Sequence, residues 1–434
     1  MGPGEVAFIL FSTFAVLVIL RVPVAFALGL AVVPVFFIDP RLTPSLLMRE
    51  MFKSYNAFVL LAVPFFLMAA NLMNSAGITD RLIRLAKAMV GHLPGGLGHV
   101  NVTVSMLFAG ISGSSTADAA GIGSLLIPQM KKEGYDASFA VAITACSSVM
   151  GVIIPPSILM VIWGGLMSVS IGGLFLAGVV PGILIALSQM ITVYVYAKRR
   201  GYPVYDRATF RELMSAVAGA SLALMTPIII VGGIVGGFFT PTEASVVAVI
   251  YSLFLGMFVY RTIAPRQLAG VLYDSARFAA ITLFCIGTAS AFGWVLAYFK
   301  IPVAVVSQVE ALGLGTIGTG IMIAVAFLII GMFIDAIPAI IILGTVLMPV
   351  AAHVHIHPIH FAIIGVLSLS FGLVTPPYGL CLLIAASIGQ IRLVHALRDV
   401  GVILAPMLCV LLLIILLPDL ILALPRWIMP QFVQ

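Results

Sequence analysis

Four short segments place hydroxyl, carboxyl, glycine and proline residues inside otherwise apolar stretches of this sequence. They are Gly110–Asp118 (GISGSSTAD), Gly151–Ser157 (GVIIPPS), Gly331–Pro338 (GMFIDAIP) and Gly372–Tyr378 (GLVTPPY). A Pro-Pro pair removes two amide donors from a helix and frees carbonyl oxygens upstream of it. Freed carbonyls, hydroxyls and a carboxylate are suitable ligands for a hard cation such as sodium, because such ions prefer oxygen. The four segments therefore predict cation binding.

The same segments also suit an anion, because a helix is expected to begin directly after each break. The N-terminus of a helix presents free N–H groups and the positive end of its dipole. None of the four segments contains Lys or Arg. An anionic substrate would therefore be held by dipoles, hydroxyls and co-bound cations, and sodium ions would supply the missing positive charge.

Asp118 and Asp335 are the acids deepest in apolar sequence. Acids within membrane-spanning segments are functional hypotheses by default, so we expect both in or beside the cation site. The alternative for each is a helix cap at the tip of a hairpin. Glu243, which follows a Thr-Pro-Thr sequence, is expected only to cap a helix. The alternative for the Pro-Pro pairs is a structural kink, and for Ser112–Thr116 it is a flexible loop.

These segments lie in a chain whose composition suits lipid rather than water. Of 434 residues, 62% are apolar and 8% are charged, whereas a soluble domain has about 25% charged residues. Three long runs lack Asp, Glu, Lys and Arg: Ala137–Ala197, Leu213–Thr242 and Ala336–Ile391. A spanning helix needs about 20 apolar residues, so the longer runs hold two elements each. The net charge of +6 comes from basic residues scattered at helix ends, and it does not indicate nucleic-acid binding.

Hydropathy predicts a series of apolar helices and two helical hairpins. The single elements are expected at 4–20, 22–38, 56–76, 137–163, 172–197, 219–238, 241–260, 276–299, 359–387 and 400–424, and the hairpins at 97–131 and 317–352. The first element lacks a basic leader and a small-residue cleavage site, so it is expected to be a retained spanning helix. Segment 78–91 has one apolar and one basic face, which is typical of a helix lying along the membrane interface.

Two further groups of residues could hold a metal ion or react with an oxidant. The four cysteines are expected to be small buried apolar side chains; they are Cys146, Cys285, Cys381 and Cys409. The histidine-rich run His353–His360 is expected to form an exposed outer loop rather than a metal site, because no carboxylate or cysteine accompanies it.

The distribution of Lys and Arg indicates the orientation in the membrane. We place Lys198–Arg211 in the cytoplasm and let both hairpins return to their own side. All but five of the 21 basic residues then fall on the cytoplasmic side; the exceptions are Arg41, Arg49, Lys53, Lys300 and Arg426. Both chain ends are therefore expected on the periplasmic side.

The chain contains an internal repeat. Gly331 follows Gly110 by 331 − 110 = 221 residues, and the same shift superposes 106–165 on 327–386 without a gap. The matching pairs are Gly110 and Gly331, Gly123 and Gly344, Pro128 and Pro349, Ser147 and Ser368, Gly151 and Gly372, and Pro155-Pro156 and Pro376-Pro377. Each predicted repeat has an odd number of crossings, so the second is inverted relative to the first. Inverted repeats with discontinuous elements are typical of secondary transporters.

The segment Leu107–Pro128 (LFAGISGSSTADAAGIGSLLIP), together with the two Pro-Pro breaks, resembles the large membrane subunit of tripartite ATP-independent periplasmic (TRAP) transporters. The resemblance covers essentially the whole chain. It implies an all-α polytopic membrane protein of the ion-transporter type, with inverted repeats, two re-entrant helical hairpins and two discontinuous helices. It further implies an elevator mechanism with co-transported sodium ions.

Carried onto this sequence, the resemblance places sodium at Ser112–Thr116 with Gly151–Pro155, and at Gly331–Asp335 with Gly372–Pro376. The predicted sodium-site residues are Gly110, Ser112, Gly113, Ser114, Asp118, Gly151, Pro155, Gly331, Asp335, Gly372 and Thr375. The predicted substrate contacts are Ser114, Ser115, Thr116, Ser157, Thr375 and Pro376.

The resemblance also implies a domain division. Scaffold helices are expected at 1–91 and 166–316, transport-domain hairpins with broken helices at 92–165 and 317–390, and a C-terminal helix at 391–434. The expected partners are a separate small four-helix membrane subunit, a periplasmic binding protein, an organic-acid substrate such as a C4-dicarboxylate or a sialic acid, and the lipid bilayer of the bacterial inner membrane.

Three other functions compete with this interpretation. A stand-alone ion-coupled anion symporter needs no binding protein. An ATP-driven permease is disfavoured because the chain has no GxxxxGK[ST] segment and because its broken helices recur as an inverted repeat. An intramembrane aspartyl protease would need the carboxyls of Asp118 and Asp335 to meet, and neither acid lies in a GxGD sequence. The chain is therefore not expected to be an enzyme.

Overall fold

The computed structural model describes residues 2–432, and every regular element in this range is helical. The first half contains α1 (Pro3–Ile19), α2 (Val24–Ala31), α3 (Pro44–Tyr55), α4 (Ala62–Ser75), α5 (Ile78–Val90), α6 (Gly96–Ser112), α7 (Ser115–Lys132), α8 (Ala137–Ser148), α9 (Ile158–Met167) and α10 (Ile171–Arg200). The second half contains α11 (Phe210–Val235), α12 (Pro241–Phe254), α13 (Pro265–Tyr298), α14 (Ile301–Ala311), α15 (Thr316–Gly331), α16 (Ala336–His353), α17 (Pro358–Gly372), α18 (Leu380–Gly389), α19 (Leu393–Leu416) and α20 (Pro418–Ile428). Short helical turns join some of these; they are η1 (Val33–Phe37), η2 (Phe58–Leu61), η3 (Val149–Val152), η4 (Leu255–Val259) and η5 (Pro430–Phe432).

Seven helical segments in the described residues are long and apolar enough to cross a membrane. They are η2 with α4, α10, α11, α12 with η4, α13, α16 and α19. Shorter apolar helices flank the Pro-Pro pairs, where α8 is separated from α9 and α17 from α18. The lengths and apolar character of these helices confirm that the protein is an all-α, polytopic membrane protein.

Several boundaries differ from the hydropathy prediction. Helices α3 and α14 lie outside the predicted elements, and α13 begins well before the predicted start at residue 276. Hydropathy misses the first turns of α13 because they carry Arg266, Asp274 and Arg277. The predicted element 400–424 is divided into α19 and α20, because Pro418 begins a new helix.

The amphipathic helix expected at 78–91 forms as α5, but its apolar face does not lie against lipid. Ile78, Leu82 and Leu85 are buried, and the helix packs against α6 and α11. Its basic face remains partly or fully exposed. Most of its apolar side therefore covers protein, and the location of the helix along the membrane interface stays a prediction.

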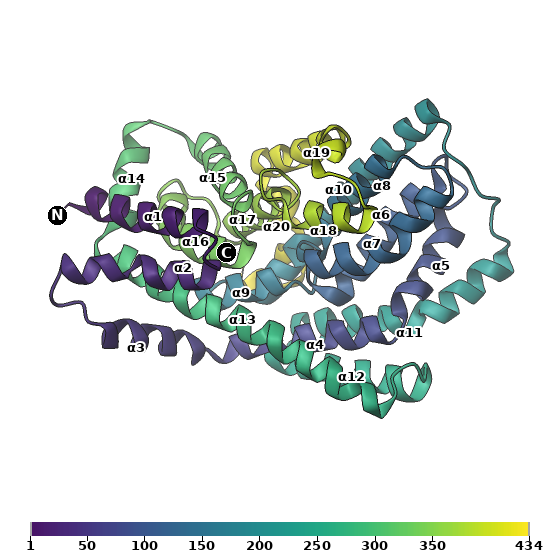
Figure 1. Ribbon diagram of the computed structural model, residues 1–434, viewed down its shortest axis with the longest axis horizontal. Helices are drawn as coiled ribbons and strands as arrows, with labels where there is room; N and C mark the ends of the chain where they lie inside the picture. The colour runs from purple at the N-terminus through teal and green to yellow at the C-terminus, as the bar shows by residue number, and fades with distance from the viewer. Residues whose placement is uncertain (1, 433–434) are drawn as a thin grey trace.

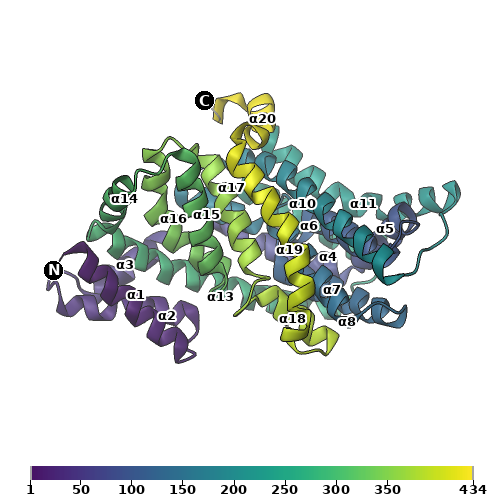
Figure 2. The ribbon, with the colours of Figure 1, turned by 90° about the horizontal axis from the view of Figure 1, so that it is seen from above.

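The helices form two groups by their packing. Helices α3, α4, α11, α12 and α13 lie along the lower edge of Figure 1, and α8, α10, α15, α17 and α19 lie above them. Figure 2 shows the same arrangement from above, with α17 and α19 crossing the middle of the molecule and α1 and α2 at its outer edge. In the upper group α7 packs against α8 and α18, and α10 packs against α6, α17 and α19. Helices of both sequence repeats therefore share this group.

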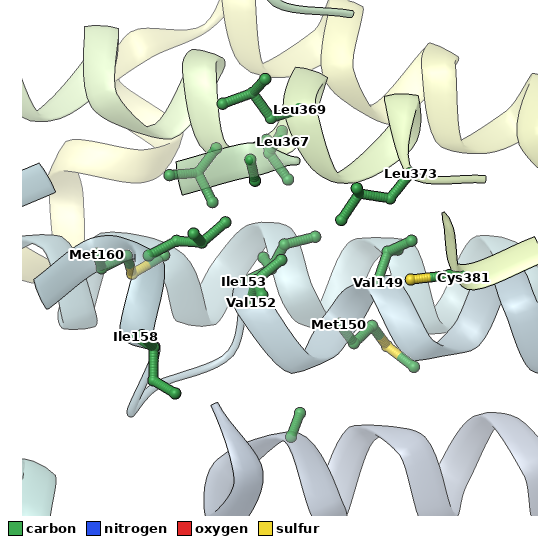
Figure 3. Packing of buried hydrophobic residues seen from close by; sticks show 14 of the residues in the cluster. Val149, Met150, Val152, Ile153, Ile158, Met160, Leu367, Leu369, Leu373 and Cys381 are labelled. Carbon is green, nitrogen blue, oxygen red and sulfur yellow. The ribbon is translucent and has the colours of Figure 1, made fainter. Parts of the chain in front are cut away.

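The core between the two broken helices is apolar and tightly packed. Figure 3 shows Leu367, Leu369 and Leu373 of the α17 segment facing Val149 and Ile153 next to α8, with Cys381 beside Val149. All six side chains are nearly or fully buried. The two halves of the repeat therefore meet directly around their breaks.

Gly372 and Gly331 allow the backbones of α17 and α15 to touch. A Cβ at Gly372 would lie 2.7 Å from Gly331 Cα and 2.9 Å from the Leu328 carbonyl oxygen. Small residues at helix interfaces permit such close packing in membranes. The sequence repeat thus conserves Gly372 at a position where a side chain does not fit.

We expect Gly372→Ala to destabilise the protein by about 1–3 kcal/mol, because an overpacked core must shift its backbone. The matched control is Gly401→Ala on α19, where a Cβ would meet nothing within 4 Å and alanine favours the helix. Thermal unfolding of the purified protein in detergent measures both. An unchanged melting temperature in the Gly372 variant would show that α15 and α17 do not pack as described.

Two smaller predictions, on Glu243 and on the cysteines, have clear outcomes. Glu243 caps α12, as expected, since its carboxylate accepts from the Thr240 N–H at 2.8 Å. Cys146, Cys285 and Cys381 are buried, but Cys409 is exposed on α19 and was predicted wrongly. It lies on the face of α19 that does not contact the core.

The histidine-rich run forms the expected exposed loop only in part: residues 354–357 lie between helices and His355 is exposed, but the two ends of the run are helical. His353 ends α16, where its Nε2 lies 2.9 Å from Glu310, and His360 is buried in α17, where its Nε2 lies 3.0 Å from the Ile414 carbonyl oxygen. His357 caps α17 through the Ile359 N–H. Helical periodicity resumes within the run, so the alternation of histidines does not correspond to an extended strand.

Candidate functional site

The tip of the first hairpin is built on Gly113. Helix α6 ends there with a φ of +63°, a left-handed conformation that favours glycine, and a Cβ would lie 2.9 Å from the Pro156 carbonyl oxygen. Ser114 then caps α7, because its hydroxyl accepts from the Ala117 N–H at 3.4 Å. The Gly113 carbonyl accepts from the Ile158 N–H at 3.2 Å. The tip is therefore fixed to the first Pro-Pro break.

Asp118 points back into this tip. Its side chain is fully buried, Ser112 donates to its Oδ1, and its Oδ2 has no hydrogen-bond partner among the described residues. Gly151 lies directly against Oδ2, where a Cβ would overlap it. The alternative role of helix cap belongs to Ser114, so the carboxylate of Asp118 is free for another function.

The first break carries Ser157 inside the protein. Helix α9 begins after Ser157, whose hydroxyl donates to the Val152 carbonyl at 2.7 Å and accepts from the Met160 N–H at 3.3 Å. The residue is completely buried. The Pro155–Pro156 peptide bond is cis. Ser157 was predicted to contact substrate, and the structure places its hydroxyl away from the surface, bridging the break.

Gly110 lies between the break and a helix of the other group. A Cβ there would lie 3.2 Å from Pro227 Cβ on α11 and 3.6 Å from the Pro155 carbonyl oxygen. The first tip therefore packs against the lower group of helices, and Pro155 contributes backbone oxygen rather than a polar side chain.

The second tip is more open. Asp335 caps α16, because its carboxylate accepts from the Ala336 N–H at 2.8 Å. Thr375 donates to the Phe371 carbonyl at 2.7 Å. Thr375 and Pro376 are half-buried, whereas Pro377 and Tyr378 are exposed. The Tyr378 N–H donates to the Met332 carbonyl at 3.1 Å, so this tip is likewise fixed to its break.

The two tips are equivalent in backbone but not in charge. At the 221-residue offset Asp335 corresponds to Ser114, and both cap a helix. Asp118 corresponds to Ala339. The first tip therefore holds its carboxylate inside, and the second holds its carboxylate at the helix end.

A buried polar network, which the sequence reasoning missed, supports only the first hairpin. Asn101 donates to Thr144 at 2.7 Å and accepts from Ser147 at 2.9 Å, and Ser105 donates to Ser147 at 2.8 Å. The second repeat has Met322 and Ala326 in place of Asn101 and Ser105. The matching Ser368 hydroxyl is correspondingly without a partner among the described residues.

The sequence predicts Cys381 only as a buried apolar side chain. In the structure it lies between the hydroxyl-rich first tip and the second Pro-Pro break. Its N–H donates to the Leu373 carbonyl at 3.0 Å, and the helix that carries it, α18, packs against α7 and α8. Ser115 is buried between the hydroxyls of Ser114 and Thr116, which lie 3.1 Å apart. The hydroxyl-rich tip and the second break are therefore neighbours in space.

Sodium fits the first cluster better than a transition metal. No group of three His, Cys, Asp or Glu side chains within residues 2–432 could hold a metal ion. The first tip instead offers the Asp118 carboxylate, whose Oδ2 is unpaired, and the hydroxyl of Ser112 beside it. A buried carboxylate oxygen without a partner is costly, and a bound cation would reduce that cost.

A cluster of charges lies at the ends of α8, α10 and α19. Arg200 contacts Asp136 at 2.7 Å and Asp399 at 2.9 Å, and Ser138 donates to Asp399 at 2.7 Å. Tyr202 donates to Asp136 at 2.8 Å. Burial raises the pKa of Tyr202 to about 12, so its phenol keeps the donated proton at neutral pH. This charge cluster joins the two repeats.

The segment 201–209, which connects α10 to α11, crosses the base of the first hairpin. Tyr205 donates to Glu133 through its phenol and to the Gly91 carbonyl through its N–H, at 3.2 Å for the latter. Lys87 of α5 lies 3.8 Å from the centre of the Tyr205 ring. We call residues 201–209 the connecting strap.

Comparison with known proteins agrees with this architecture. The sequence profile of the DctM component of tripartite ATP-independent periplasmic transporters matches residues 11–420. The chain is 39% identical over 378 residues to the sialic acid TRAP transporter large permease protein SiaM of Vibrio cholerae, covering 87% of this chain and 88% of that protein. It is 37% identical over 379 residues to the C4-dicarboxylate TRAP transporter large permease protein DctM of Pseudomonas aeruginosa, with 87% and 89% covered.

Two further comparisons extend this picture. The chain is 34% identical over 406 residues to the 2,3-diketo-L-gulonate TRAP transporter large permease protein YiaN of Escherichia coli, covering 94% of this chain and 96% of that protein. Among solved structures, the Alcanivorax borkumensis YdaH transporter is similar in fold, with a TM-score of 0.63 at 14% identity and with 86% and 88% of the two chains covered.

Proposed function

Because the chain belongs to the DctM family, the large permease component of TRAP transporters, we propose that it carries a small organic acid inward using a sodium gradient. The chain is a multi-pass membrane subunit that works in transport of organic acids, and its relatives are permeases rather than enzymes. The proposal adds the coupling ion, the moving part and the partners. The relatives are named as transporters of sialic acid, C4-dicarboxylate and 2,3-diketo-L-gulonate.

The single observation that carries sodium coupling is the unpaired Oδ2 of buried Asp118. The four breaks contain no Lys or Arg that could neutralise it. The Ser112 hydroxyl donates to the other carboxylate oxygen, and Gly151 packs so closely against Oδ2 that a side chain there would overlap it. Sodium bound there would also offset the negative charge of an incoming organic acid.

An elevator motion is supported by the way the helices group. Helices α6 to α10 and α15 to α19 pack together around the two breaks, and the charge cluster ties α8, α10 and α19. We propose that these helices move as one unit against α1–α5 and α11–α14. The proposal differs from the expected scaffold segment 166–316, because it assigns α10 to the moving unit on the ground that α10 packs against α6, α17 and α19.

The proposed partners are a small four-helix membrane subunit and a periplasmic binding protein. Large apolar side chains on the outer side of the lower group are exposed; they include Phe238, Phe254, Phe258, Tyr273 and Phe278. Lipid and the small subunit would cover these side chains. The binding protein would deliver substrate on the periplasmic side, where we place both chain ends.

Reconstitution in liposomes tests the proposal. The permease is combined with its small subunit, and binding protein loaded with radiolabelled substrate is added outside. We expect uptake to require an inward sodium gradient and the binding protein, and to be unaffected by ATP inside. Sodium-driven uptake without binding protein would instead identify a stand-alone symporter, and uptake driven only by a proton gradient would refute sodium coupling.

A further inference from the structure

The two Pro-Pro breaks differ most at the residue that follows them. Ser157 follows the first pair and is completely buried, with its hydroxyl used inside the protein. Tyr378 occupies the equivalent position after the second pair, at 378 − 157 = 221 residues. Its side chain is 44% exposed. The second repeat therefore has an exposed aromatic side chain, Tyr378, where the first repeat has a buried serine, Ser157, whose hydroxyl bridges the break.

A second exposed ring is carried by the backbone segment to which Tyr378 is bonded. The Tyr378 N–H donates to the Met332 carbonyl at 3.1 Å, and the next residue, Phe333, is 53% exposed. Both rings are carried by non-helical backbone, between α15 and α16 and between α17 and α18. Irregular backbone at membrane depth does not face lipid, and it survives only against protein or a water-filled cavity. The two rings are therefore expected to face protein or a water-filled cavity, unlike exposed aromatic residues on regular helices, and on the proposed function that cavity is the transport path.

The aromatic pair also adjoins the hydroxyl-rich tip. Tyr378 lies two residues before the start of α18 at Leu380, and α7 begins with Ser115. Ser115 is flanked by the hydroxyls of Ser114 and Thr116, and α18 packs against α7. One end of a bound organic acid could therefore reach hydroxyls and helix N-termini while its other end meets the two rings.

Few side-chain polar groups near the two rings are left to form hydrogen bonds with a substrate. The Thr375 hydroxyl already donates to the Phe371 carbonyl, and the Asp335 carboxylate accepts from the Ala336 N–H. A polyhydroxylated acid would leave several hydroxyls without partners there, and buried unpaired polar groups are costly. Rings favour contact with an apolar carbon skeleton.

We propose that Tyr378, together with Phe333, contacts the carbon skeleton of the substrate and selects carboxylates with an apolar body over polyhydroxylated sugar acids. This inference rests on the proposed function, since it assumes that the two breaks border the substrate path. It names Tyr378 as the specificity-determining residue of the second repeat.

The test measures binding at the permease itself, because a binding protein would otherwise select the substrate first. Purified permease with its small subunit, in nanodiscs and in sodium buffer, is titrated with 4-methyl-2-oxopentanoate, phenylpyruvate and gluconate. We expect the two apolar-bodied acids to bind about tenfold or more tightly than gluconate, which is the discrimination that apolar contacts typically provide.

Tyr378→Ser is expected to lower this preference about tenfold. It should weaken the binding of the two apolar-bodied acids and leave the affinity for gluconate unchanged. Phe333→Leu should reduce the preference less, because leucine keeps apolar contact. Tyr273→Ser is the matched control, since Tyr273 is 69% exposed on the regular helix α13. A merely structural role would change the affinity for all three acids equally.

Two results would overturn the inference: a wild-type preference for gluconate, or Tyr378→Ser affinities that retain the wild-type ratio. Sodium-driven uptake by the complete system, with the substrate of its own binding protein, is measured on the same variants. Loss of sodium dependence in the wild type would refute the proposed function, whereas intact sodium-driven uptake with an unaltered binding ratio would refute only the role of Tyr378.

Discussion

Replacing Asp118 with asparagine is expected to weaken sodium activation of uptake by about 100-fold or more. The substitution keeps the size of the side chain and an acceptor for Ser112, but it removes the charge from a fully buried position. Removing one partner of a buried charge pair costs about 3–5 kcal/mol, and each 1.4 kcal/mol is about tenfold in affinity. Uptake into liposomes is measured over a range of sodium concentrations.

Asp335→Asn is the informative comparison. Asp335 is the repeat's other carboxylate, but it caps α16 and is not fully buried. Asparagine is also a good capping residue, so the cap survives and any loss of sodium activation reports on the charge alone. We expect a smaller effect than for Asp118. If Asp118→Asn retains wild-type sodium activation, the buried carboxyl does not hold the coupling cation.

Replacing Arg200 with alanine is expected to destabilise the protein by about 3–5 kcal/mol, because it leaves the buried carboxylate of Asp399 without its cation. The Asp399 side chain is 4% exposed and that of Arg200 31% exposed. Tyr196 and Ser138 would still donate to Asp399, at 3.1 Å and 2.7 Å, so the loss should fall toward the lower end of that range. Thermal unfolding in detergent measures the change.

A double substitution separates charge from packing. Arg200→Ala combined with Asp399→Asn removes both charges, so it should recover part of the stability lost by Arg200→Ala alone. Arg199→Ala is the control, because the neighbouring Arg199 is exposed and makes no ion pair within residues 2–432. Equal destabilisation by the Arg199 and Arg200 variants would contradict the importance of the charge cluster.

The backbone of the site was predictable because the residues that determine it act locally. Gly113 sets a left-handed turn, the Pro-Pro pairs interrupt helices, and Ser114 caps a helix. Each of these effects depends on a few neighbouring residues, so the sequence predicts where helices end. Their repetition at one offset identifies which breaks belong together. The membrane face from which each hairpin enters stays a prediction.

The contacts between distant residues were not predictable in the same way. The ion pair of Arg200 with Asp399 joins residues 199 positions apart, and no pattern in either segment indicates the other. The burial of Ser157 and the exposure of Tyr378 depend on what packs over each break. Helix α3 and the start of α13 were missed because charged residues lower their mean hydropathy, and α14 was missed because its 11 residues are too few for a spanning helix.

The connecting strap has a consequence for how far the protein can move. Extended chain spans at most about 3.6 Å per residue, so the nine residues 201–209 reach about 32 Å when fully released. Tyr205 bonds to Glu133 at the end of α7 and to Gly91 at the end of α5, so it connects the proposed moving unit to the proposed fixed unit. An elevator stroke must therefore break one of these two contacts. If Tyr205 stays with Glu133, only residues 206–209 span the gap, and they reach about 14 Å. A longer stroke must also detach Tyr205 from Glu133.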